Sequence, residues 1–186
     1  FGFSLLSWKT SGAHFNPAIT LALLVLKKIE ITTAVFYIIA QFLGAFIASG
    51  FVFIQLNDDI ADMIKAKSVM GIPTPFGAYD GSELVAELMG TFFIAYVYMA
   101  CYTDPNKNKV KDIGPFAVSS IFCVCIITLG ELSGGGFNPA RSLAPAIISG
   151  VVGNLQFIHF LGPIVGAILA AIIYNSVFID DVDDIN

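Results

Sequence analysis

The chain has 186 residues, of which 56% are hydrophobic and 12% charged, and its mean hydropathy is +0.82. Soluble domains carry about 25% charged residues, so this composition would leave large apolar patches facing water, which excludes a soluble enzyme. The nine lysines and arginines cannot form a groove that tracks phosphates, and the net charge is −5, so a nucleic-acid binder is excluded too. The composition indicates a polytopic membrane protein.

The first residues, 1–6, are already apolar. They are too short for a signal peptide and lack a basic leading segment. The segment is therefore interpreted as part of a membrane span, and we expect the first part of the protein to precede it.

Long stretches without charge follow, and a spanning helix needs about 20 apolar residues. They predict four full spans, at about 31–55, 82–102, 113–131 and 157–179. The apolar segments 16–26 and 138–149 are too short to cross a bilayer at about 1.5 Å per residue. Each follows a glycine-containing stretch, which predicts half-helices that enter the membrane and stop.

The connections and their charges predict the orientation. Residues 56–80 and 103–112 have the charged, proline and glycine content of loops. Counted on alternating sides, most lysines share one side: Lys9, Lys27, Lys28, Lys107, Lys109 and Lys111. Only Lys65 and Lys67 fall on the other. The positive-inside rule makes the first side cytoplasmic, together with the acidic tail at 180–186.

The three cysteines imply no disulfide framework. Cys101, Cys123 and Cys125 all lie in apolar stretches, and the last two are spaced so that a helix turns them to different faces. We interpret them as small thiols in lipid-facing or packing surfaces.

An internal repeat relates the two half-helices. Ser11–Ala22 matches Ser133–Ala144 at a constant offset of 122, with eight of twelve positions identical. An odd number of predicted spans separates the copies, so they enter from opposite faces. This is the pattern of an inverted repeat whose broken helices meet near the membrane midplane.

The residues at this meeting point predict its chemistry. Asn16 and Asn138 are predicted N-caps, and Pro17 and Pro139 take the first helical position, where a missing N–H costs nothing. Each helix start carries roughly half a positive charge, so two facing ends repel cations. The asparagine amides can donate to the oxygen of a neutral molecule.

Before each cap, the chain is expected to run extended and to expose carbonyl acceptors. These residues are Gly12, Ala13 and His14, then Gly134, Gly135 and Gly136. Donors at the centre and acceptors towards each mouth suit water or a small polyol, and they suit no ion.

With both Asn-Pro-Ala motifs, at 16–18 and 138–140, the chain resembles the aquaporin, or major intrinsic protein, family. The resemblance also rests on SGAHFNPAIT, GGGFNPARS, ELMGTFF at 87–93 and IGPFAV at 113–118, and it covers essentially all 186 residues. Ala18 and Ala140 complete the two motifs.

The resemblance implies an all-α membrane protein with an aquaporin-like right-handed bundle of six spanning helices plus two re-entrant half-helices, assembled as a homotetramer. By that template the sequence lacks the first helix and much of the second. It is expected to form one channel domain, with a partial first repeat at 1–56, a connecting loop at 57–80 and a second repeat at 81–179.

The family also implies roles for single residues. Arg141 resembles the selectivity-filter arginine, and Ile126 and Gly135 match two further filter positions, the fourth lying upstream of Phe1. Strict water channels usually have histidine at the position of Ile126, and many members carry a mercury-sensitive cysteine at that of Gly135. Glu87 resembles a glutamate that accepts hydrogen bonds from the loops' backbone N–H groups.

Two histidines leave alternatives open. His14 is interpreted either as a proton switch at the pore mouth or as a carbonyl contributor whose ring packs nearby. His159 stands where the family usually has an aromatic residue next to a tryptophan, and here the pair is His159-Phe160.

The resemblance implies a passive water channel that excludes protons and ions, with ammonia or urea as further solutes. Ser142, at a position where glycerol facilitators typically carry aspartate, favours water over glycerol. The alternatives are a glycerol facilitator, a structural protein at membrane junctions, and, more remotely, an intramembrane protease using Ser133 and His14. No cofactor, metal or nucleic-acid partner is implied, and plasma and vacuolar-type membranes both fit.

Overall fold

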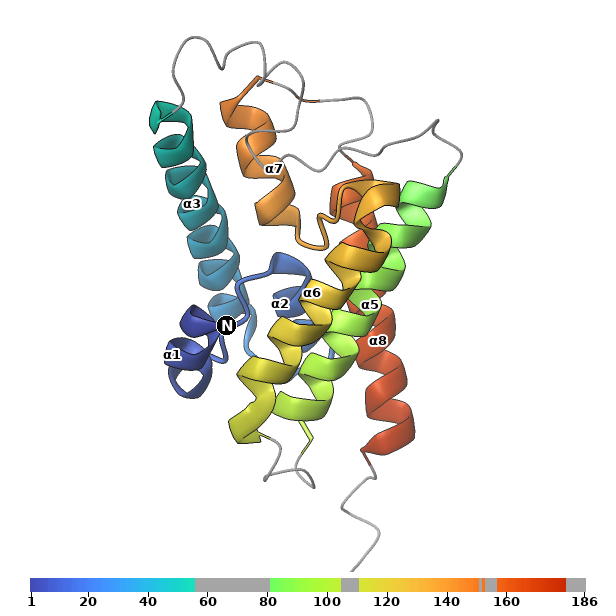
Figure 1. The fold of residues 1–186 in the computed structure, drawn as a ribbon. Helices are drawn as coiled ribbons and strands as arrows, with labels where there is room; N and C mark the ends of the chain where they lie inside the picture. Colours follow the sequence, from blue (N-terminus) through green and yellow to red (C-terminus); the bar gives the residue numbers. More distant parts are fainter. Residues whose placement is uncertain (56–80, 105–110, 151, 153–156, 180–186) are drawn as a thin grey trace, which may run out of the picture.

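The computed structural model describes residues 1–55, 81–104, 111–150, 152 and 157–179, and these residues form helices joined by turns, with no strand among them (Figure 1). The helices are α1 (Gly2–Ser11), α2 (Pro17–Val25), α3 (Ile31–Gln55), α5 (Ser82–Tyr102), α6 (Gly114–Ser133), α7 (Pro139–Ile148) and α8 (Ile158–Phe178).

The predicted spans and half-helices are confirmed within the described residues. Four of their helices are long and apolar enough to cross a membrane: α3, α5, α6 with the turn before it, and α8. The two predicted half-helices, α2 and α7, have only nine and ten residues. The apolar segment at 1–6 continues as a helix to Ser11. The predicted loop at 57–80 and the tail at 180–186 lie outside the described residues.

Helix α5 is the centre of the packing. It packs against α6 on one side and α8 on the other, while α2 packs on α8 and α3, and α7 packs on α3. In Figure 1, α7 and α2 lie one below the other in the space between α3 and the group formed by α5, α6 and α8. Both half-helices therefore pack against the longer helices α3 and α8.

Small residues allow α8 to approach α5 closely. A Cβ on Gly166 would meet the carbonyl oxygen of Leu88, and a Cβ on Gly162 would lie 2.8 Å from the Cβ atom of Glu87. Gly90 faces the ring of Phe137 in the same way. These three glycines are packing residues.

Gly44 differs from these three glycines in the described structure. A Cβ at Gly44 would have no neighbour within 4 Å, because this face of α3 borders a cavity rather than another described helix.

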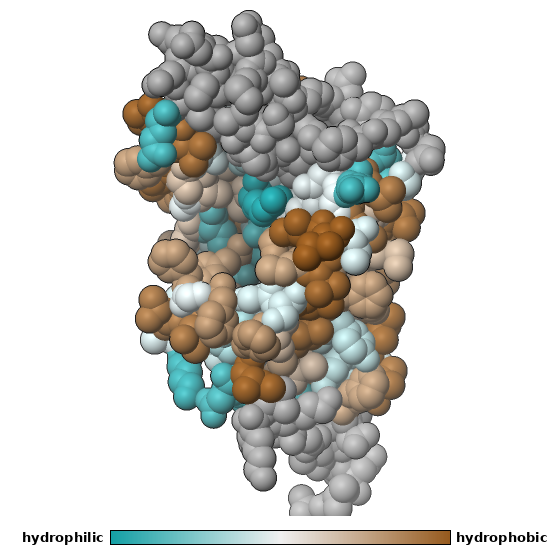
Figure 2. Space-filling view, viewed as in Figure 1, coloured by the Kyte–Doolittle hydropathy of each residue, from teal (hydrophilic) through white to brown (hydrophobic). Residues whose placement is uncertain are grey.

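The outer surface is largely apolar. Large hydrophobic side chains are exposed on every long helix, for example Phe36 at 72%, Ile127 at 78% and Val177 at 63%. In Figure 2 this surface surrounds a recess between the α1 and α3 side and α6, and more polar atoms are visible inside the recess. An apolar exterior of this kind suits lipid.

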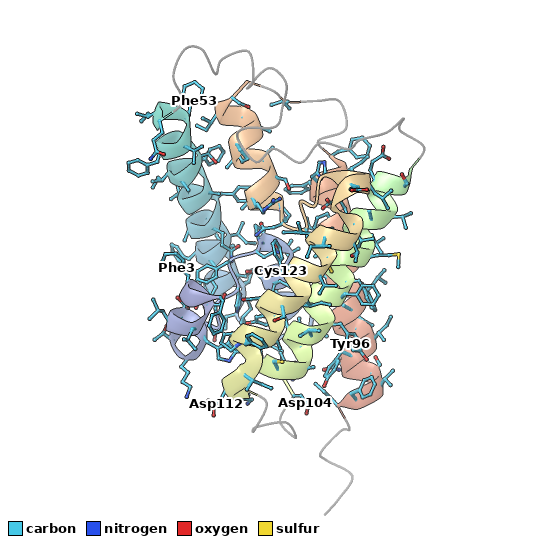
Figure 3. The ribbon with its side chains drawn as sticks, viewed as in Figure 1. Phe3, Phe53, Tyr96, Asp104, Asp112 and Cys123 are labelled. Atoms are coloured by element: carbon cyan, nitrogen blue, oxygen red, sulfur yellow. The ribbon has the colours of Figure 1, made fainter. Side chains whose placement is uncertain are left out.

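One end of the bundle agrees with the predicted alternation of sides. Lys9, at the end of α1, forms an exposed ion pair of 3.0 Å with Asp112, just before α6. Figure 3 shows Asp112 and Asp104 at the same end of the bundle. The end of α1, the end of α5 and the start of α6 therefore lie on one side, as the count of lysines requires.

Candidate functional site: two half-helices that meet at their asparagine caps

Both half-helices begin at the residues that the sequence predicts. The Oδ1 atom of Asn16 accepts a hydrogen bond from the N–H of Ala18 at 2.9 Å. The Oδ1 atom of Asn138 accepts from the N–H groups of Ala140 and Arg141, at 3.0 and 3.2 Å. A proline occupies the first turn of each half-helix. Each cap therefore satisfies N–H groups that would otherwise be unpaired at a helix start.

The two motifs are joined to each other through the same asparagines. Asn16 Nδ2 donates to the carbonyl of Phe137 at 2.8 Å, and Asn138 Nδ2 donates to the carbonyl of Phe15 at 2.7 Å. These reciprocal bonds hold the N-terminal ends of α2 and α7 together, as the inverted repeat predicts. Each amide nitrogen carries two hydrogens, so one remains for another acceptor.

The backbone before each cap differs from the predicted extended path. Both loops contain left-handed residues, and these match in pairs at the repeat offset of 122. The φ angles are 74° and 85° for Gly12 and Gly134, 51° and 66° for Ala13 and Gly135, and 46° and 52° for Phe15 and Phe137. Such angles curl the chain and cost about 1–3 kcal/mol at a non-glycine residue. The reciprocal asparagine bonds offset that cost, because they require the Phe15 and Phe137 carbonyls in this orientation.

Of the six backbone carbonyls that the sequence predicts as acceptors before the caps, three accept hydrogen bonds from side chains of the protein. Gly12 O accepts from the hydroxyl of Tyr98 at 2.7 Å. Gly135 O and Gly136 O accept from Arg141 Nη1, at 2.8 and 3.4 Å. A carbonyl has two lone pairs, so each can still accept from a passing molecule.

A fully buried carboxylate lies behind the second loop. Glu87, on α5, accepts from the Ser133 hydroxyl and the Gly136 N–H at Oε1, at 2.7 and 2.8 Å, and from the Phe137 N–H at Oε2, at 2.6 Å. This matches the contacts that the family resemblance implied. The three bonds compensate for burying the charge.

Two consecutive peptide groups therefore lie between Glu87 and Arg141. The group joining Gly135 to Gly136 directs its N–H to Glu87 and its C=O to Arg141. The next group, joining Gly136 to Phe137, has the same two partners, with a longer distance to the arginine. Because peptide groups are planar and rigid, the carboxylate and the guanidinium fix the same piece of backbone from opposite sides.

The first loop is supported by neutral side chains instead. Thr20 donates to Asn16 O at 3.2 Å, accepts from Gln41 Nε2 at 2.9 Å, and lies 3.1 Å from His14 Nδ1. Neither Thr20 nor Gln41 is among the site residues predicted from the sequence. The available signals were the alignment of Thr20 with Ser142 in the repeat and the single amide in the middle of the apolar span at 31–55.

The ring of His14 is buried and packed among tyrosines. Its centroid lies 5.1 Å from that of Tyr37 and 5.8 Å from that of Tyr98, and its Nδ1 atom is engaged with Thr20. This arrangement matches the interpretation of a packed ring.

The remote protease alternative requires a hydrogen bond between Ser133 and His14. In the structure, the Ser133 hydroxyl donates to Glu87 instead, so the dyad is not formed.

The three predicted filter residues come together. Arg141 contacts Gly135 through the hydrogen bond to its carbonyl. A Cβ built on Gly135 would lie 3.6 Å from Cγ1 of Ile126, and Ile126 itself is 36% exposed.

Two cavities adjoin the meeting point of the half-helices. One of about 340 Å³ is lined by Arg141, Ala140, Asn138 and Gln41, among others. Another of about 290 Å³ borders both asparagines, His14 and the Cys123 thiol of α6, and Figure 3 shows Cys123 midway along that helix. The N-terminal ends of both half-helices thus border cavities that are large enough to hold small molecules.

The fold and the site together define an integral membrane protein with several spans, in which two re-entrant half-helices meet at asparagine caps. The family model of the major intrinsic proteins matches residues 4–174. The chain therefore belongs to the major intrinsic protein family.

Two relatives are plant aquaporins. The chain is 38% identical to aquaporin TIP2-3 of Arabidopsis thaliana, over 91% of this chain and 64% of the relative. It is 39% identical to the probable aquaporin TIP2-2 of Oryza sativa subsp. japonica, over 90% of this chain and 63% of the relative. The chain thus spans just under two thirds of these relatives' length.

A solved structure has the same fold. The X-ray structure of the aquaglyceroporin from Plasmodium falciparum matches with a TM-score of 0.72 and 24% identity, over 94% of this chain and 77% of that one. This likeness confirms the aquaporin-like fold that the sequence predicts.

Proposed function

We propose that the protein is a passive channel for water, and that the half-helix junction is the centre of its pore. The main support for this proposal is the reciprocal pair of hydrogen bonds from Asn16 to the Phe137 carbonyl and from Asn138 to the Phe15 carbonyl. They fix two amides beside a cavity, each with one hydrogen available to a permeating oxygen. The plant relatives, which are named as aquaporins, support the same activity.

The same geometry favours exclusion of cations and protons. The N-terminal ends of α2 and α7 each carry roughly half a positive charge, and Arg141 adds a full charge beside the second motif. A water at the centre that accepts from both asparagines cannot also relay a proton along a continuous chain. The channel catalyses no chemical step and needs no cofactor.

The filter residues favour a wider solute range than water alone. Ile126 cannot form hydrogen bonds, and Gly135 contributes no side chain, so two of the three walls are apolar or small. Arg141 is held by the carbonyls of Gly135 and Gly136, and its charge repels cations whatever the width of the pore at the filter. Ammonia and urea are the proposed additional solutes.

The filter proposal is tested by Ile126→His, which adds a polar edge. The single change is measured first, because a cysteine at Gly135 would have to adopt a φ of 66°; the pair with Gly135→Cys follows. We expect the urea-to-water and ammonia-to-water permeability ratios to fall. A parent protein that passes water alone, or ratios that do not change in the variants, would overturn the proposal.

Water is favoured over glycerol by Ser142. This small side chain is buried in α7 directly after Arg141, where the glycerol facilitators carry aspartate. Stopped-flow swelling of proteoliposomes containing the full-length protein tests the choice. Water permeability well above that of empty vesicles, with much slower glycerol entry, is expected; equal acceleration of glycerol would favour the facilitator.

The proposed orientation places the end with Lys9 and Asp112, and with it the tail at 180–186, in the cytoplasm. The exposed apolar faces of the long helices contact lipid and neighbouring copies in a homotetramer. A purely structural role at membrane junctions remains the alternative. That role would be supported if vesicles with a normal content of the protein showed no increase in water permeability over empty vesicles.

A further inference from the structure

His159 is a buried titratable side chain that the proposed pore does not use. It lies in the first turn of α8, with 6% of its side chain exposed. Its Nδ1 atom is 3.3 Å from Glu87 Oε1, and a Cβ built on Gly136 would be 3.1 Å from the same nitrogen. The ring therefore touches both the supporting carboxylate and the loop that the carboxylate holds.

The contact determines which ring nitrogen carries a proton. An ionised carboxylate only accepts hydrogen bonds, so an unprotonated Nδ1 would place two lone pairs against each other. Nδ1 forms no aligned hydrogen bond in the structure, to Glu87 or to any other described residue, so its 3.3 Å contact with Glu87 is one of ion-pair distance. The arrangement is therefore favourable only when Nδ1–H points towards Glu87.

From Glu87 the connection to Arg141 is short and rigid. Glu87 binds the N–H of Gly136 and that of Phe137, and the carbonyls of the same two peptide groups bind Arg141 Nη1. A shift or rotation of the Glu87 carboxylate would tilt the planes of both peptide groups. It would move the guanidinium together with them.

We propose that His159 is a positioning residue for the filter: its Nδ1–H orients Glu87, and through the two peptide groups it sets the position of Arg141. Glu87 is the partner of His159 on α5. Of the two half-helices packed on α8, α7 carries Arg141 and α2 contains no charged residue. The proposal rests on the proposed channel function, because the expected change is one of selectivity.

The test compares His159→Asn with His159→Phe in proteoliposomes of the full-length protein. Asparagine can place an amide N–H close to the position of Nδ1, whereas phenylalanine keeps a ring and removes the donor. We expect His159→Phe to change the urea-to-water permeability ratio by about threefold or more, and His159→Asn to keep the parent ratio. Phe160→Leu, at the exposed neighbouring position, is the matched control.

A second arm tests the route through Glu87. In a Glu87→Gln background, adding His159→Phe should change the ratio no further, because the two residues act in series. Equal shifts for both His159 variants, or a lower melting temperature with an unchanged ratio, would overturn the proposal. A parent protein without water permeability would instead contradict the channel function, so the two failures are distinguishable.

Discussion

At the scale of single residues, Glu87 supports the loop that carries the filter. It is fully buried and accepts three hydrogen bonds, two of them from consecutive backbone N–H groups. Its replacement by glutamine would direct an amide N–H₂ towards some of these donors. Since a buried donor without an acceptor costs about 1–3 kcal/mol, the side chain is important for stability as well as for position.

We therefore predict that Glu87→Gln lowers the free energy of unfolding by about 1–3 kcal/mol, seen as a lower melting temperature in detergent. Glu131→Gln is the control, because Glu131 lies on the neighbouring helix α6 with its side chain exposed. Equal melting temperatures for the two variants would show that the hydrogen bonds of Glu87 do not stabilise the loop.

Mercurials provide a second prediction for single residues. Gly135 offers no thiol at the position where many family members are blocked, whereas Cys123 is exposed and lines the cavity beside Asn16 and Asn138. Cys125 is buried, with its Sγ atom 3.6 Å from Gly90 O. Mercurials should therefore react with Cys123 and thereby reduce the water flux.

The measurement is water permeability before and after mercurial treatment. Cys123→Ser should remove the inhibition, and Cys125→Ser should leave it unchanged. Strong inhibition that survives Cys123→Ser would place the reactive group elsewhere and contradict the pore position of Cys123.

At the scale of elements, length and hydropathy predicted the spans and half-helices well. The caps followed from local sequence, because Asn-Pro-Ala contains both the capping side chain and the proline of the first turn. The bonds between the motifs join residues more than 120 positions apart, and only the repeat pointed to them. The left-handed angles at Phe15 and Phe137 could not be predicted, because they depend on those distant partners rather than on local preference.

Helix packing gives a prediction at this scale. Gly166→Ala should prevent α8 from approaching α5, because the added methyl group would meet the carbonyl of Leu88. Gly44→Ala should be tolerated, since a Cβ there has no neighbour within 4 Å. We expect the yield of folded protein, measured by size-exclusion chromatography in detergent, to fall sharply for the first variant only. Equal yields would contradict the close packing of α5 and α8.

At the scale of the whole molecule, the two repeats use different chemistry for the same geometry. Their loops have matching φ angles and reciprocal asparagine bonds. One loop is supported by Thr20 and Gln41, and the other by Glu87 and Ser133. Glu87 and Arg141, the charged residues that contact the second loop in the described structure, thus both come from the segment expected to form the second repeat, 81–179.

Two opposed half-helices are proposed to pass water and to block protons. The decisive measurement is osmotic water permeability together with proton flux in the same proteoliposomes of the full-length protein, loaded with a pH-sensitive dye. We expect water permeability to rise with the amount of protein, while proton flux stays at the level of empty vesicles. A proton conductance that increases in proportion to water permeability would contradict this proposal.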